Sequence, residues 1–134
     1  MKARILLIED NADNLELARY LLAAAGHEVL LATNGAQGLD VARAEQPDMI
    51  VSDLQMPVMD GYALIAALKC DPSCLGIPVI ALTAFSMPGD EARVMQAGFD
   101  GYLSKPIEPE QFSAQIADLL SSNRRAAESP PAAA

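Results

Sequence analysis

Apolar and polar positions along this chain are arranged in blocks. Four short, mainly apolar runs, at 5–8, 49–52, 79–82 and 101–104, are separated by longer segments in which apolar residues recur every three or four positions. Unbroken apolar runs of this length are typical of strands buried on both faces, and the wider spacing is typical of amphipathic helices. The pattern therefore predicts strands that alternate with helices along most of the chain.

A fifth strand is predicted at 28–33, because the turn pair Asn34-Gly35 follows it directly. Helical spacing is found over 12–25, 36–46, 62–69, 89–97 and 109–120. The helix at 89–97 is short and charged, so we expect it to be weak. Strands separated by helical segments imply right-handed crossovers and a parallel sheet. The predicted fold class is α/β: one doubly wound (βα)5 domain with a five-stranded parallel sheet and helices on both faces.

The composition changes near the end of the chain. At 134 residues the protein fits one domain, and no internal repeat is visible. From about residue 121 onward the sequence is dominated by Ser, Asn, Arg, Glu, Pro and Ala, a composition that buries little apolar surface. We therefore expect a folded domain over 3–121 and a frayed helix end or disordered tail over 122–134.

Charge and cysteine content narrow the possible partners. The net charge of −9 and the pI near 4.3 argue against nucleic acid or an acidic membrane as a direct partner. No apolar stretch approaches the roughly 18 residues of a membrane span, and no signal peptide is recognisable, so a cytoplasmic location is expected. Cys70 and Cys74 have no second pair to complete a metal site, so we interpret them as reduced thiols.

Polar residues of different chemistry follow four of the strands. Glu9 and Asp10 follow the first run, and Asp53, Thr83 and Lys105 follow the runs at 49–52, 79–82 and 101–104. Each alone is ordinary, since acids in loops, an Asp cap and a surface lysine are all common. Together they would meet at the carboxyl edge of the sheet, where α/β proteins bind ligands.

The acids in that group need a counter-charge. Two like charges about 4 Å apart repel by about 4 kcal/mol at an effective dielectric constant near 20. A divalent cation relieves this repulsion, and Mg²⁺ prefers a few carboxylates with several waters, which leaves room for a phosphate oxygen. Acids, a hydroxyl and an ammonium in one cleft therefore indicate a site that holds Mg²⁺ and a phosphoryl group.

At this point the sequence resembles the receiver domain of two-component response regulators, from about Ala3 to Leu120. The motifs that carry the resemblance are Ile8-Glu9-Asp10-Asn11, Asp53-Leu54-Gln55-Met56-Pro57 with Asp60-Gly61, Thr83-Ala84, and Lys105-Pro106. Residues 81–91 look closest to stand-alone DivK-type regulators and to the receivers of hybrid kinases. The resemblance implies a flavodoxin-like receiver fold.

The resemblance also implies roles for the site residues. Asp53 would accept a phosphoryl group from a phosphohistidine of a histidine kinase or a histidine phosphotransfer protein. The Mg²⁺ ligands would be the side chains of Asp10 and Asp53 and the backbone carbonyl of Gln55, with Glu9 acting through water. Thr83 would bind the phosphoryl oxygen and Lys105 would pair with it or with Asp53. The Lys105-Pro106 peptide is expected to be cis.

Two further roles concern the output of the domain. Tyr102 occupies the aromatic switch position of the family, and would turn inward when Thr83 moves toward the phosphoryl group. The face formed by the helix at 89–97, the strand at 101–104 and the last helix would then contact a downstream protein, or the phosphoryl group would be relayed onward. Phe85 is expected to fold over the cleft and shield the acyl phosphate from water; the competing interpretation is that it points away into the surface of the helix at 89–97 and leaves the path of water open.

Three other interpretations stay open on the residues alone. A phosphatase of the haloacid-dehalogenase type needs a second acid two residues after the first, where this chain has Gln55, and usually a cap domain. A flavodoxin-like FMN carrier needs a phosphate loop after the first strand, where residues 9–14 are acidic. A receiver that works only as an interaction module would keep the fold without the chemistry. We expect a signalling protein that catalyses its own phosphorylation and dephosphorylation on aspartate, not a conventional enzyme.

Overall fold

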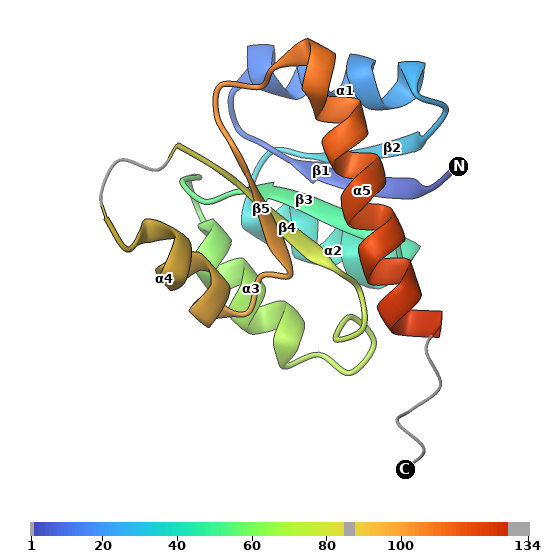
Figure 1. Ribbon diagram of the computed structural model, residues 1–134. Coiled ribbons are helices and arrows are strands. Elements are labelled where there is room, and N and C mark those ends of the chain that lie inside the picture. Colours follow the sequence, from blue (N-terminus) through green and yellow to red (C-terminus); the bar gives the residue numbers. More distant parts are fainter. Residues whose placement is uncertain (1, 85–87, 129–134) are drawn as a thin grey trace.

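The computed structural model describes residues 2–84 and 88–128, and within them one parallel sheet lies between two layers of helices (Figure 1). The strands are β1 (Arg4–Ile8), β2 (Glu28–Ala32), β3 (Met49–Asp53), β4 (Val79–Thr83) and β5 (Gly101–Ser104). Their order in the sheet is β2-β1-β3-β4-β5, and every pairing is parallel. The predicted doubly wound (βα)5 fold is therefore confirmed.

The helices divide between the two faces of the sheet. They are α1 (Ala12–Ala24), α2 (Gly35–Glu45), α3 (Gly61–Lys69), α4 (Asp90–Ala97) and α5 (Pro109–Glu128). Figure 1 shows α1 and α5 on one face and α2, α3 and α4 on the other. No helix within the described residues is both long and apolar enough to cross a membrane.

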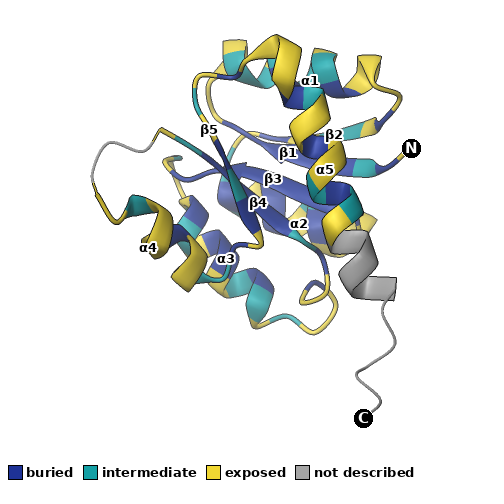
Figure 2. Cartoon of the chain, viewed as in Figure 1, coloured by how far each residue is buried: buried dark blue, intermediate teal, exposed yellow. Residues whose placement is uncertain are grey.

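Each face of the sheet has its own hydrophobic core. Successive residues of β1 point to opposite faces: Leu6 and Ile8 pack with α2, α3 and α4, whereas Ile5 and Leu7 pack with α1 and α5. These four side chains are fully buried, and burial of each contributes about 1.5–3 kcal/mol. Figure 2 shows the buried strands between helices whose outer surfaces are exposed. The uninterrupted apolar runs of the sequence reflect this burial on both faces.

The last two helices differ in how they are held. α4 has eight residues, of which Val94 is the buried one, and its N-cap Gly89 provides no side-chain hydrogen bond. α5 continues beyond residue 121 to Glu128, into the segment for which a frayed helix end or a disordered tail is expected. Its apolar positions Phe112, Ile116 and Leu120 are buried against the sheet. The division into a domain over 3–121 and a tail over 122–134 stays a prediction, and residues 129–134 lie outside the described part of the chain.

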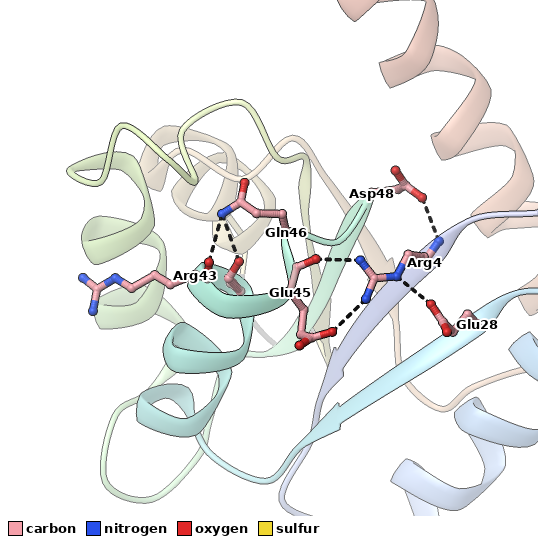
Figure 3. A network of polar contacts seen from close by, with 7 residues as sticks. Arg4, Glu28, Arg43, Glu45, Gln46 and Asp48 are labelled. Atoms are coloured by element: carbon pink, nitrogen blue, oxygen red, sulfur yellow. Dashed lines mark hydrogen bonds and ion pairs between the residues drawn. The ribbon is translucent and has the colours of Figure 1, made fainter.

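Ion pairs fasten the amino edge of the sheet, the edge farthest from the predicted site (Figure 3). The guanidinium of Arg4 donates to Glu28 Oε2 at 2.5 Å, to the backbone oxygen of Glu45 at 2.6 Å and to Glu45 Oε1 at 2.9 Å. The backbone N–H of Arg4 donates to Asp48 Oδ2 at 2.8 Å. The start of β1 is thereby tied to β2, to the end of α2 and to the loop before β3. Nearby, Gln46 ends α2 in the left-handed conformation, with φ 47°.

Candidate functional site

The carboxyl edge of the sheet brings the predicted residues together in one cleft. Strand register places the ends of β1, β3 and β4 side by side, since Ile8 is paired with Ser52 and Asp53 with Leu82. The cleft encloses about 520 Å³. It is lined by Glu9, Asp10, Asn11, Asn14, Asp53, Leu54, Gln55, Tyr62, Thr83, Ala84, Asp90, Arg93, Val94 and Lys105. All six residues predicted for metal binding or phosphoryl transfer are in this list.

Lys105 bridges two of the acids. Its Nζ lies 3.0 Å from Asp53 Oδ2, to which it donates a hydrogen bond, and 3.2 Å from Glu9 Oε2. Burial alone would lower the pKa of Lys105, but the hydrogen bond and charge of Asp53, together with the charge of Glu9, outweigh it and raise the pKa. The backbone N–H of Lys105 donates to Thr83 O at 2.8 Å, and the peptide to Pro106 is cis as expected. Lys105 is therefore a charged group whose position beside Asp53 is fixed by its contacts with the two acids.

Glu9 is the least satisfied charge in the cleft. It is 1% exposed, and its Oε1 accepts a 3.2 Å hydrogen bond from the backbone N–H of Asn11. Its Oε2 accepts no hydrogen bond of normal geometry from any described residue, although Lys105 Nζ lies 3.2 Å away as an ion-pair partner. Burial raises the pKa of Glu9, the charge of Asp53 raises it further, and the charge of Lys105 offsets only part of this. The cleft therefore holds more buried negative charge than its own residues neutralise.

These acids fit a divalent cation. One carboxylate oxygen from each of Glu9, Asp10 and Asp53 lies within 4.8 Å of the other two. Asp10 is exposed, so one side of the cluster is open to water. Hard oxygen donors, an excess of negative charge and room for water suit Mg²⁺, which keeps several waters when it binds proteins. The backbone N–H of Gln55 makes a long 3.4 Å contact to Asp53 Oδ1. The predicted role of the Gln55 carbonyl as a ligand stays a prediction.

A close backbone approach holds the loop that follows Asp53. The N–H of Gly61 donates to Leu54 O at 2.9 Å, which folds the start of α3 against the end of β3. A Cβ at Gly61 would lie 2.6 Å from Asp53 O and 2.8 Å from Leu54 Cα, so a side chain there has no space. Asp60 caps α3 by accepting a 2.8 Å hydrogen bond from the N–H of Ala63. The Asp60-Gly61 pair, recognised in the sequence as a loop signal, therefore fixes the backbone of Asp53.

Tyr102 lies outside the cleft. Its hydroxyl donates a 3.0 Å hydrogen bond to Glu91 Oε2 on α4, and this bond, with burial and the charge of Glu91, raises the pKa of Tyr102. Tyr102 lines a separate cavity of about 300 Å³ between β5 and the start of α5. The structure thus bonds the tyrosine hydroxyl to α4. Phe85, the predicted shield of the acyl phosphate, lies outside the described residues.

Several residues line the cleft that the sequence analysis did not single out. Arg93 and Asp90 reach it from α4, Asn14 from α1 and Tyr62 from α3. Tyr62 is positioned by an edge-on contact with Phe99, with ring centroids 6.2 Å apart. A signal for Arg93 exists in the sequence: it lies three residues after Asp90, so both share a helix face just beyond the strand that ends in Thr83.

Comparison with known proteins agrees with this architecture. The family model described as the response regulator receiver domain matches residues 5–117. The polar-differentiation response regulator DivK of Brucella anthropi is 42% identical over 120 residues, which are 90% of this chain and 98% of that protein.

Solved structures give the same result. The receiver domain of a signal transduction histidine kinase from Syntrophus aciditrophicus is 34% identical, with a TM-score of 0.82 over 97% of this chain and 98% of that one. The receiver domain of a sensor histidine kinase from Pseudomonas aeruginosa is 30% identical, with a TM-score of 0.81 over 90% of this chain and 99% of that one. The latter structure has a magnesium ion coordinated in its active site cleft.

Proposed function

Because the chain belongs to the response regulator receiver family, we propose that Asp53 accepts a phosphoryl group from a phosphohistidine of a histidine kinase or phosphotransfer protein. The observation that carries the proposal is the arrangement around Asp53. Its carboxylate is held 3.0 Å from Lys105 Nζ, in a cleft whose other acids call for a cation. Such a carboxylate is a suitable covalent carrier of a phosphoryl group.

Transfer of the phosphoryl group depends on the positioning of the reacting atoms and on the stabilisation of negative charge more than on proton transfer. One carboxylate oxygen of Asp53 attacks phosphorus, the new O–P bond forms, and the N–P bond of the donor breaks with its electron pair left on the imidazole nitrogen. If the other ring nitrogen of the donor is already protonated, the ring leaves neutral. Lys105 faces the oxygens on which negative charge is spread, and Thr83 at the end of β4 offers its hydroxyl to one of them.

Magnesium has a defined place in this proposal. The residues that would hold it are Glu9, Asp10, Asp53 and the carbonyl of Gln55, with Glu9 acting through water. When bound, Mg²⁺ would neutralise charge on the transferring oxygens and orient them. The buried, unsatisfied Glu9 Oε2 and the close grouping of three acids support this assignment.

We propose that the signal leaves through the face formed by α4, β5 and α5. The phosphoryl group draws the hydroxyl of Thr83 toward it, and Tyr102 exchanges its bond to Glu91 for a more inward position. α4 supports this role because it is short and held by one buried side chain, and weakly held elements are the ones that rearrange. A downstream protein would bind the changed face, or a second phosphotransfer protein would take the phosphoryl group onward.

Labelling by a small phosphodonor tests the acceptor. Incubation with acetyl phosphate and Mg²⁺ is expected to add one phosphate to the wild-type chain, measured by intact mass. Asp53→Asn should abolish the adduct, and EDTA should suppress it. Asp40→Asn, which removes an exposed acid of α2, is the matched control and should label as wild type does. Equal labelling of Asp53→Asn, or equal labelling in EDTA, would refute the assignment.

A further inference from the structure

Arg93 places a second cation in the phosphoryl cleft. Among the described residues that line the cleft, Arg93 and Lys105 are the cations, and Glu9, Asp10, Asp53 and Asp90 are the acids. Lys105 already pairs with two of these acids, at 3.0 and 3.2 Å. Arg93 is therefore the cation of the cleft that forms no ion pair with an acid among the described residues.

Arg93 also differs from the other arginines whose side chains the structure describes. Arg4, Arg19 and Arg43 each form an ion pair with a neighbouring acid. Arg93 is exposed and, within the described residues, forms no ion pair. Its side chain can thus turn toward a ligand in the cleft without breaking an ion pair with any residue that the structure describes.

A second cation at the cleft would also balance the charge that the phosphoryl donor brings. Glu9, Asp10 and Asp53, which are grouped at the predicted metal position, would be neutralised by Lys105 together with one divalent cation, and Asp90 lies apart from them on α4 with Arg93. A phosphoryl donor then brings about 1.5 to 2 negative charges at neutral pH. These charges enter a partly buried space, where unbalanced charge is costly. A further cation at the mouth of the cleft would offset them.

We propose that Arg93 binds the phosphoryl oxygens of the incoming donor at the α4 side of the cleft. The planar guanidinium donates two parallel hydrogen bonds to such oxygens, a geometry that a lysine cannot reproduce. Lys105 lies directly after β5 and Arg93 lies on α4, so the two cations reach the cleft from different parts of the fold. This inference rests on the proposed function, since it concerns the same transfer to Asp53.

Two quantities test the role of Arg93: the second-order rate constant for phosphorylation of Asp53 by acetyl phosphate, and the concentration of beryllofluoride that half-saturates the protein with Mg²⁺. In the first, Asp53 oxygen attacks phosphorus and the P–O bond to acetate breaks with its electron pair on acetate. Arg93→Gln should lower the rate constant about fivefold and weaken beryllofluoride binding by a similar factor. Arg93→Lys should recover part of both losses.

The matched control is Arg43→Gln, which changes the net charge equally but lies on α2, paired with Asp71 and outside the residues that line the cleft. It should leave both quantities as in wild type. If Arg93→Gln and Arg43→Gln behave alike, whether both are unchanged or both are slowed, the role of Arg93 is refuted while the assignment of Asp53 stands. If the wild-type chain is not phosphorylated at all, both proposals fail together.

Discussion

At the amino edge of the sheet the charged side chains are exposed and matched, whereas at the carboxyl edge two acids are buried beside a single close cation. Arg4 forms ion pairs with two glutamates and its backbone N–H binds a third acid. Glu9 is buried and one of its oxygens accepts no hydrogen bond among the described residues. Both edges are rich in charge, so charge alone does not mark a functional site. The difference is that the acids of the amino edge are paired with Arg4, whereas the carboxyl edge leaves a buried glutamate oxygen without a hydrogen bond among the described residues.

The largest expected effect is at the carboxyl edge, where backbone segments meet. Gly61→Ala would place a methyl group too close to backbone atoms of Asp53 and Leu54, so the backbone itself would have to shift. We expect a loss of about 2–3 kcal/mol in the free energy of unfolding, measured by urea denaturation, and slower phosphorylation of Asp53. Gly76→Ala is the control, because its added Cβ would contact nothing within 4 Å. Equal stability of the two variants would contradict the close approach.

A smaller and opposite effect is expected from Glu9→Gln. Without metal, the substitution removes a buried charge while keeping the shape of the side chain, so the free energy of unfolding should rise by about 1–2 kcal/mol. With Mg²⁺ the difference in the free energy of unfolding between the variant and the wild-type chain should shrink or change sign, because the wild-type chain gains more from binding the ion. Thermal unfolding in EDTA and in Mg²⁺ measures both. Glu45→Gln, an exposed partner of Arg4, should show neither effect. A loss of stability on Glu9→Gln in EDTA would mean that the acid is already satisfied.

The smallest effect is expected at the amino edge. Arg4→Met keeps the apolar stem of the side chain and removes three guanidinium contacts. Exposed ion pairs are weak, so the urea midpoint should fall only slightly. The rate of phosphorylation by acetyl phosphate should not change, because this edge is remote from the cleft. A slower rate with unchanged stability would show that the two edges are coupled.

Much of the fold was predictable because positions buried in the core are apolar and can be recognised in the sequence. Central strands covered on both faces must be apolar throughout, and this is why β1, β3 and β4 could be located. The extent of α5 beyond residue 121 was harder to predict. Arg124 to Glu128 favour helix, but they carry no apolar pattern that would bury one face of it. A composition typical of a tail is thus compatible with helix.

The site was predictable where residues follow strand ends, and less so elsewhere. A parallel sheet brings Glu9, Asp53, Thr83 and Lys105 to one edge whatever the details of the loops. The contact between Tyr102 and Glu91 joins a strand to a helix eleven residues earlier, and it depends on side-chain directions that spacing does not give. Arg93 was missed because its spacing from Asp90 places both residues on one helix face but does not show that this face borders the cleft. The roles of these residues in phosphoryl transfer stay predictions until the variants are measured.

The division of the hydrophobic core by the sheet has a mechanical consequence. Val94 anchors α4 in the core shared with α2 and α3, whereas α1 and the buried side chains of α5 belong to the core on the other face. A tilt or partial melting of α4 would therefore repack one layer and leave the other undisturbed. A protein seated over α1 would meet the same surface before and after such a change, and a protein seated over α4 would not. One small domain can in this way present a binding surface that stays constant and a second one that changes with its state.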